Sequence, residues 1–204
     1  MEKSMKKTYI DNKALVFILK MILWPLVKIK GIRINEHHKP DETGIIVVSP
    51  HTSNWDFLYG FYYVLTYKRK AKFLIKDSWC KGIIGKIMLY FGAIPVNRGK
   101  AGNMVDEVAE FIKEHREHKF LIAVTPEGTR GKSDKWKEGF YYIAQKADCP
   151  IYMATIDYSD STLNIWEQFK VSDNKDADIQ KLLAIASTAK GKNPDNQYPE
   201  YKKD

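Results

Sequence analysis

Short runs of β-branched residues alternate with amphipathic helical patterns through most of this chain, and this alternation restricts the fold more than any other feature. The strand-like runs occupy residues 44–49, 72–75, 93–96, 120–124 and 150–156. Apolar residues at helical spacing lie between them, at 55–67, 83–91, 104–115 and 139–146. A further strand at 165–171 is expected at an edge of the sheet, with a helix at 179–188 after it. Strands and helices in alternation are typical of an α/β fold.

The length of 204 residues suits one domain, and the chain has neither an internal repeat nor a long linker. We therefore expect a helical anchor over residues 1–35, a single main domain over 36–172, and a C-terminal helix with a polar tail over 173–204. The tail is rich in Lys, Asn and Pro, and it is expected to carry no chemistry.

The segment at residues 14–29 is apolar but is interrupted by Lys20, Pro25 and Lys28. About 20 mostly apolar residues are needed to cross a bilayer, so this segment is short for spanning. It favours an amphipathic helix in the membrane interface, with Trp24 at headgroup depth and the lysines at anionic lipid phosphates. The alternative is an ordinary amphipathic helix packed on the domain. The first interpretation predicts a peripheral or monotopic membrane protein.

The formal net charge of +8 and the isoelectric point near 9.2 predict an anionic partner, which could be nucleic acid, a phosphorylated substrate or an acidic membrane surface. The chain contains no recognised nucleic-acid module, so nucleic acid is not expected as a partner. Cys80 and Cys149 lie far apart without metal-ligand spacing, and no cleavable signal peptide precedes the domain. A reduced protein at the cytoplasmic face of the membrane, without a metal site, is therefore expected.

The segment SPHTSNWD places His51 just after a predicted strand, with Asp56 five positions later in the first turn of the next helix. A carboxylate that holds one imidazole nitrogen as a donor leaves the other nitrogen able to accept a proton from a hydroxyl. This pairing requires His51 to fold back over the N-terminus of the helix. Ser53 and Asp56 also match a capping box, in which Asp56 would only accept from a backbone N–H. The residues alone leave both interpretations open.

A second polar segment, VTPEGTRGK at 124–132, again follows a strand directly. Gly128 lets a ligand approach the backbone, Thr129 offers a hydroxyl, and Arg130 presents a guanidinium suited to phosphate oxygens. The alternative is a surface turn in which Glu127 pairs with Arg130 or with another cation.

A third segment, GAIPVNRGK at 92–100, ends a strand with Arg98, which is a further guanidinium beside a flexible turn. Ligands in open α/β sheets collect beyond the carboxyl ends of the strands. The three polar segments are therefore expected to meet in one crevice, although they lie far apart in the sequence.

In this order, the segments resemble the glycerolipid acyltransferase family that includes the 1-acyl-glycerol-3-phosphate acyltransferases. HTSNWD fits the family's pattern of His, four residues and Asp, and residues 92–98 resemble its second block. EGTR at 127–130 reads as the third block, and CPIYMATI at 149–156 is similar to the fourth. The likeness covers residues 51–156, with WKEGF at 136–140 similar to the family's step into a helix. The second block departs from the pattern before its arginine, and the N-terminal apolar region is short for the paired anchoring helices of some members.

The resemblance implies a mixed central β-sheet flanked by helices, with an N-terminal helical element seated in one membrane leaflet. It implies a catalytic pair of His51 as base and Asp56 as its partner. It also implies an acceptor phosphate site that consists of Arg98, Glu127, Gly128, Thr129 and Arg130. The acyl donor would be acyl-CoA or acyl-carrier protein, and no metal or redox cofactor would be needed.

The acceptor implied by the resemblance is a phosphate-bearing lysolipid such as 1-acyl-sn-glycerol 3-phosphate, used in phospholipid biosynthesis. The alternatives are another lysolipid, glycerol 3-phosphate, or a noncatalytic basic protein that binds lipid. The acyl chain would need an apolar groove, to which one or two residues of the helix after His51 would contribute. The residues considered are Phe57, Leu58, Phe61 and Tyr62, most of which are expected to pack in the core.

Overall fold

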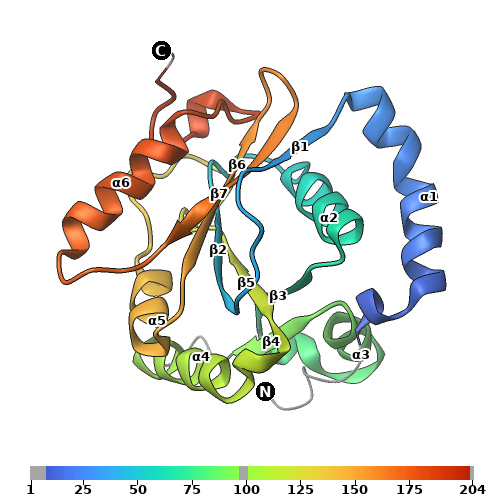
Figure 1. Cartoon of the computed structure of the whole chain (residues 1–204), viewed down its shortest axis with the longest axis horizontal. Helices are drawn as coiled ribbons and strands as arrows, with labels where there is room; N and C mark the ends of the chain where they lie inside the picture. The colour runs from blue at the N-terminus through green and yellow to red at the C-terminus, as the bar shows by residue number, and fades with distance from the viewer. Residues whose placement is uncertain (1–7, 97–100, 203–204) are drawn as a thin grey trace.

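The computed structural model describes residues 8–96 and 101–202, which form a seven-stranded sheet with helices on both faces (Figure 1). The strand order is β1-β7-β6-β2-β5-β3-β4. All neighbouring strands are parallel except β6 and β7, so the sheet is mixed. The strands are β1 Arg33–Glu36, β2 Gly44–Val48, β3 Lys70–Lys76, β4 Ala93–Val96, β5 Phe120–Val124, β6 Ile151–Asp157 and β7 Thr162–Phe169.

The helices divide between two apolar clusters, one on each face of the sheet. The cluster on one face includes side chains of α4, α5 and α6, and the cluster on the other includes side chains of α1 and α2. Figure 1 shows α5 and α6 on one side of the central strands and α1 and α2 on the other. The helices are α1 Lys13–Lys30, α2 Asp56–Tyr67, α3 Gly82–Tyr90, α4 Ala101–His115, α5 Gly139–Ala147 and α6 Lys175–Ser187.

Strand β2 shows why the sequence reads as a continuous apolar run at this point. Ile45 and Val47 pack in the cluster of α4 and α5, whereas Ile46 between them packs in the cluster of α2. Successive side chains of a strand point to opposite faces, so a central strand covered on both faces needs apolar residues at every position. The α/β fold with a mixed sheet flanked by helices, expected from the sequence, is confirmed.

Strand β1 is the main element that the sequence pattern did not predict. Its residues, RINE, include a single apolar side chain, Ile34, and therefore show no strand-like alternation. It pairs in parallel with β7, with Ile34 opposite Leu163. The prediction of an edge strand at residues 165–171 is thus wrong in two respects, because β7 begins at Thr162 and β1 covers its outer side. The boundary expected between residues 35 and 36 falls inside β1.

Strand order also determines where the polar loops meet. Strand β2 lies between β5 and β6, and it is parallel to both. The carboxyl ends of these three strands therefore lie at the same edge of the sheet. The segments that follow them begin at Ser49, Thr125 and Tyr158, so residues from three distant parts of the chain are brought together.

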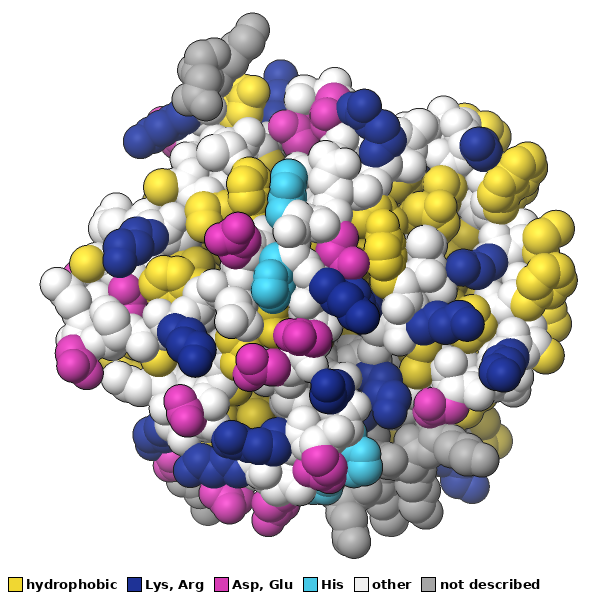
Figure 2. Space-filling view, in the orientation of Figure 1, with side chains coloured by type: hydrophobic (Ala, Val, Ile, Leu, Met, Phe, Trp, Pro, Cys, Tyr) yellow, Lys and Arg dark blue, Asp and Glu magenta, His cyan; other side chains and the backbone are white. Residues whose placement is uncertain are grey.

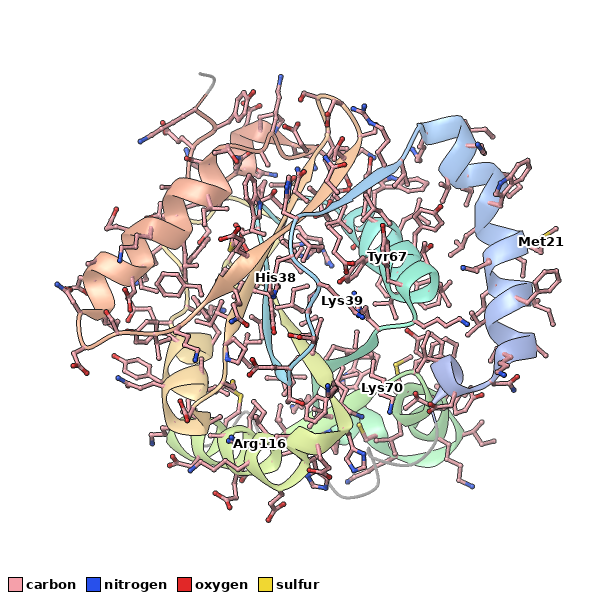
Figure 3. All side chains as sticks on the ribbon, in the orientation of Figure 1. Met21, His38, Lys39, Tyr67, Lys70 and Arg116 are labelled. Carbon is pink, nitrogen blue, oxygen red and sulfur yellow. The ribbon has the colours of Figure 1, made fainter. Side chains whose placement is uncertain are left out.

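Helix α1 exposes most of its apolar side chains. Val16 and Val27 are buried, but a larger group is exposed, consisting of Phe17, Ile18, Met21, Ile22, Trp24, Leu26 and Ile29. Figure 2 shows hydrophobic side chains along the right-hand edge, over α1, with lysines beside them, and Met21 points away from the sheet in Figure 3. A helix simply packed on the domain would bury this group. Within residues 8–96 and 101–202, no helix is long and apolar enough to span a bilayer.

Candidate active site

His51 and Asp56 are in contact at the carboxyl end of β2. The distance between His51 Nδ1 and Asp56 Oδ2 is 2.9 Å, and the exposed fractions of the two side chains are 18% and 2%. A carboxylate accepts hydrogen bonds, so Nδ1 must carry the proton and Nε2 keeps its lone pair. The imidazole is therefore held in the tautomer that a general base requires.

The loop between His51 and Asp56 folds back over the N-terminus of α2. The same carboxylate oxygen, Asp56 Oδ2, accepts from the backbone N–H groups of Thr52 at 3.1 Å and Ser53 at 3.0 Å. The two interpretations of Asp56 are therefore both present in the structure. Asp56 binds the backbone at the start of α2 and orients the imidazole with the same oxygen.

Tyr158 occupies the other oxygen of this carboxylate. It follows β6, and its hydroxyl donates to Asp56 Oδ1 at 2.6 Å. Burial raises the pKa of Tyr158, and the hydrogen bond to Asp56 raises it further. This contact was not predictable from the sequence, because Tyr158 lies 102 positions from Asp56 and belongs to none of the motifs described above.

Glu127 contacts the loop of residues 49–55 that carries His51, and it is 5% exposed. Its Oε1 accepts from the Ser49 hydroxyl at 2.6 Å and from the backbone N–H of His51 at 3.2 Å. Burial raises the pKa of Glu127, while the hydrogen bond from Ser49 lowers it. The carboxylate thus holds the two ends of the turn that carries His51. Its predicted contact with an acceptor phosphate stays a prediction.

The other residues of the EGTR turn are exposed. Gly128 has a left-handed backbone with φ of 66°, and the Lys137 side chain occupies the place that a Cβ would take. Thr129 Oγ1 accepts from the backbone N–H of Gly131 at 3.1 Å. The Arg130 side chain makes no ion pair within the described part of the chain, so its guanidinium faces solvent.

Two further observations concern the predicted phosphate and metal sites. Arg98, the remaining residue predicted to bind phosphate, lies outside the described residues. Lys137 was quoted only as part of the WKEGF segment, yet it adds a cation beside Gly128, and its backbone N–H donates to Pro126 O at 2.7 Å. Over the described ranges, no group of three or more His, Cys, Asp or Glu side chains could hold a metal ion.

An apolar cavity of about 390 Å³ adjoins the His51–Asp56 pair, with both residues in its lining. Phe57 and Phe61 line this cavity, whereas Leu58 and Tyr62 do not, so two of the four residues considered for an apolar groove are placed there. Most of the remaining lining is apolar and comes from the strands and from α2, including Ile46, Val48, Gly60, Val64, Phe73, Leu121 and Ala123, with Phe91 added from the end of α3.

The C-terminal segment also reaches the loop that carries His51. The backbone N–H of Asn193 donates to Thr52 Oγ1 at 3.1 Å, and its side-chain amide donates to Thr52 O at 2.7 Å. Thr52 is the residue after His51. The sequence predicted no chemical role for this tail, and the structure places part of it against the residue next to the proposed base.

The comparison with protein families decides the class of protein. The family profile described as Acyltransferase matches residues 31–157, which is more than half of the chain. This chain belongs to the acyltransferase family. The family expected from the four sequence blocks is thereby confirmed.

A solved structure supports the same fold for this acyltransferase. The chain resembles the crystal structure of the 1-acyl-sn-glycerophosphate (LPA) acyltransferase PlsC from Thermotoga maritima, with a TM-score of 0.60 and 16% sequence identity. The match covers 86% of this chain and 78% of that chain. At this identity the likeness concerns the fold. No curated protein gives a significant sequence match.

Three features of this acyltransferase are suited to acyl transfer. The imidazole of His51 has a free Nε2 at the edge of the sheet, the apolar cavity lies beside it, and the exposed Arg130 follows the turn of Glu127. Trp55, at the end of the loop that carries His51, has the ammonium groups of Lys30 and Lys192 at 4.2 Å and 4.9 Å from its ring centre. Two positive charges therefore lie beside Trp55.

Proposed function

We propose that this acyltransferase moves a fatty acyl group from acyl-CoA or acyl-carrier protein to the free hydroxyl of a lysophospholipid, 1-acyl-sn-glycerol 3-phosphate. The observation that carries the proposal is the 2.9 Å contact between His51 and Asp56 beside an apolar cavity. The contact supports a neutral imidazole ready to accept a proton, and the cavity supports an apolar chain close to it. The family match supports acyl transfer as the reaction class.

In the proposed reaction, His51 Nε2 takes the proton from the acceptor hydroxyl as the oxygen attacks the thioester carbonyl. The tetrahedral intermediate then collapses, the carbon–sulfur bond breaks, and the imidazolium returns its proton to the thiolate. One ester forms and one thioester is lost, so the scheme needs no metal and no redox cofactor. Asp56 supports the imidazolium that exists between the two proton transfers.

The apolar cavity would hold an acyl chain. Burial of each methylene group contributes about 0.8 kcal/mol, so a fatty chain supplies much of the binding free energy. Phe57, Phe61 and Phe91 in the lining offer aromatic contacts to such a chain. His51 lies in the same lining, so a thioester at the mouth of the cavity would be near Nε2.

The acceptor phosphate would be bound by Arg98 and by the EGTR turn. The exposed guanidinium of Arg130, the left-handed backbone at Gly128 and the nearby ammonium of Lys137 support an anion site at this turn. The hydrogen bond from His51 N to Glu127 places the turn next to the base. Phosphate binding there would orient the acceptor hydroxyl toward His51.

The membrane is the proposed location of the reaction. The exposed apolar side chains of α1, with Lys20 and Lys28 on the same helix, suit insertion at the surface of an anionic leaflet. We propose a peripheral or monotopic protein at the cytoplasmic face, whose partners are the anionic membrane surface, the donor thioester and the lysolipid.

A transfer assay tests the proposal. Purified protein is incubated with labelled acyl-CoA or acyl-carrier protein and with acceptors that differ in the headgroup, namely 1-acyl-sn-glycerol 3-phosphate, glycerol 3-phosphate, other lysophospholipids and monoacylglycerol. The expected product is labelled phosphatidic acid, with little transfer to monoacylglycerol. Transfer to a different acceptor would change the substrate assignment.

Two binding assays separate this proposal from a protein that is not an enzyme. Flotation with lipid vesicles and no transfer to any acceptor would indicate a noncatalytic lipid-binding protein. A gel shift with nucleic acid, without flotation, would indicate that the positive charge serves a nucleic acid.

A further inference from the structure

The contacts around the His51–Asp56 pair extend to two parts of the chain outside the motifs. We propose that Tyr158 is a positioning residue for Asp56. We also propose that residues 189–197 fix the position of Tyr158 relative to the loop of residues 49–55 that carries His51. This inference rests on the proposed acyl transfer by His51, and it adds Tyr158 and residues 189–197 to the site.

Tyr158 completes the hydrogen bonding of the Asp56 carboxylate. Oδ2 accepts from the imidazole and from two backbone N–H groups of the loop, and Oδ1 accepts from the Tyr158 hydroxyl at 2.6 Å. Contacts on both oxygens prevent the carboxyl group from rotating about its Cβ–Cγ bond. Since Asp56 is 4% exposed, water is a poor substitute for the phenol. The phenol therefore fixes the direction from which the carboxylate meets His51.

Tyr158 is itself held both by its ring and by its backbone. Its ring packs against that of Tyr59 with centres 5.2 Å apart, and its backbone N–H donates to Lys190 O at 2.9 Å. Lys190 and Asn193 both lie within residues 189–197. This segment thus binds Tyr158 through Lys190 and Thr52 through Asn193.

Residues 189–197 are suited to this task because they are tied to one another. The Gln197 amide accepts from Gly191 N at 2.7 Å and donates to Ala189 O at 2.8 Å. Gly191 packs so closely that a Cβ would lie 2.9 Å from Thr52 Oγ1 and 3.1 Å from Thr52 Cγ2. A side chain at position 191 would therefore push directly on the residue after His51.

The test compares Tyr158→Phe with Tyr141→Phe as a matched control. Tyr141 is a buried tyrosine whose hydroxyl, like that of the partly buried Tyr158, binds a carboxylate, that of Asp178 at 3.0 Å, but it lies in the cluster of α4 and α5. For Tyr158→Phe we expect kcat to fall about tenfold or more with the KM of both substrates unchanged. A loss of this size is typical when a hydrogen bond that orients a functional side chain is removed. Tyr141→Phe should keep the wild-type kcat even if its thermal midpoint falls.

A pH profile separates positioning from a loss of stability. The ionisable groups that interact with the pair are Glu127 after β5, Tyr59 on α2 and Tyr158 after β6, while Tyr9, Tyr63 and Lys72 line the same cavity. Without the Tyr158 hydroxyl, Asp56 carries more of its negative charge toward the imidazole and holds a proton there more strongly. The acid limb of kcat/KM should therefore move to higher pH in Tyr158→Phe and stay in place in Tyr141→Phe.

The C-terminal contact is tested by Gly191→Ala, with Gly139→Ala as a control because a Cβ at position 139 meets nothing within 4 Å. Gly191→Ala should lower kcat without changing KM, and Gly139→Ala should not. If the wild type transfers acyl groups but Tyr158→Phe keeps both its kcat and its pH profile, the positioning role is wrong. If the wild type transfers no acyl group to any acceptor, the proposed function itself is wrong. If Gly191→Ala lowers kcat no more than the control Gly139→Ala does, residues 189–197 do not position the site.

Discussion

The backbone N–H of His51 donates to Glu127 Oε1 at 3.2 Å, although 76 positions separate the two residues. This bond joins the turn after β5 to the loop after β2, and the Ser49 hydroxyl donates to the same oxygen. The glutamate of the EGTR segment is thereby turned toward the catalytic loop, while Arg130 of the same segment faces solvent. Within this tetrapeptide, the buried Glu127 supports the loop that carries His51, and the exposed Arg130 is accessible to a ligand.

Replacement of Glu127 should affect the rate more than acceptor binding. In Glu127→Ala, the Ser49 hydroxyl and the His51 N–H lose their buried acceptor, and each such loss costs about 1–3 kcal/mol. We expect a lower thermal midpoint and a lower kcat, with the KM for the acceptor unchanged. Glu127→Gln keeps an amide oxygen as acceptor and should retain most of the activity. A raised acceptor KM with unchanged kcat in Glu127→Ala would instead favour direct phosphate binding.

Removal of the proposed base should abolish most turnover. General base assistance contributes about 10²- to 10⁴-fold, so the kcat of His51→Ala should fall by that factor. The side chain is partly exposed, so the circular dichroism spectrum and thermal midpoint should stay close to those of the wild type. His118→Ala is the control, because His118 precedes β5 at the opposite edge of the sheet. Near wild-type transfer by His51→Ala would exclude the mechanism.

The size of the apolar cavity should limit the length of the acyl chain. Gly60 lines this cavity, and a Cβ built there meets nothing within 4 Å, so a larger side chain can enter without a backbone clash. Gly60→Leu should lower kcat/KM for long-chain donors more than for medium-chain donors. Gly60→Ala is the control and should stabilise α2 by about 0.5–1 kcal/mol with little change in chain preference. An equal loss for all donors in Gly60→Leu would argue against a chain in this cavity.

Helix α1 should supply much of the affinity for membranes. Trp24 and Ile29 are 56% and 82% exposed, and burial of one such side chain contributes about 1.5–3 kcal/mol. Binding to vesicles that contain anionic lipid should therefore weaken about tenfold to a hundredfold in Trp24→Ser or Ile29→Ser. Tyr142→Ser is the control, because Tyr142 is exposed on α5. Vesicle sedimentation measures the effect, and equal binding by all variants would contradict it.

Lys72 should make stability depend on pH above neutrality. Burial, with a smaller contribution from the nearby Lys70, lowers the pKa of Lys72 from its ordinary 10.5 to about 8. Between these two values the unfolded chain binds more protons than the folded one, so the free energy of unfolding due to Lys72 rises with pH. Urea unfolding of the wild type and of Lys72→Met should show a difference that shrinks as pH increases from 7 to 9.5. Parallel curves would mean that Lys72 is not desolvated in the folded protein.

Much of the fold could be predicted because its signals are local. The runs at 44–48 and 120–124 are apolar at nearly every position, as central strands covered on both faces must be, and helix spacing is clear between them. The contact between His51 and Asp56 and the position of EGTR after a strand were also predictable, because both depend on residues close in sequence. Strand β1 was not predictable, because pairing with β7 and not its own residue pattern holds it in the sheet.

The remaining features depend on strand order, which no local pattern expresses. Glu127 and Tyr158 reach His51 and Asp56 because β2 lies between β5 and β6, so that loops from distant positions share one edge. Asn193 reaches Thr52 from the segment after α6. The exposure of the apolar face of α1 likewise depends on where the helix lies, because its sequence favours an interfacial helix without excluding a packed one. Residue periodicity thus sets which segments form strands and helices, while the packing of those segments sets which polar groups, separated by tens of positions, come within hydrogen-bonding distance.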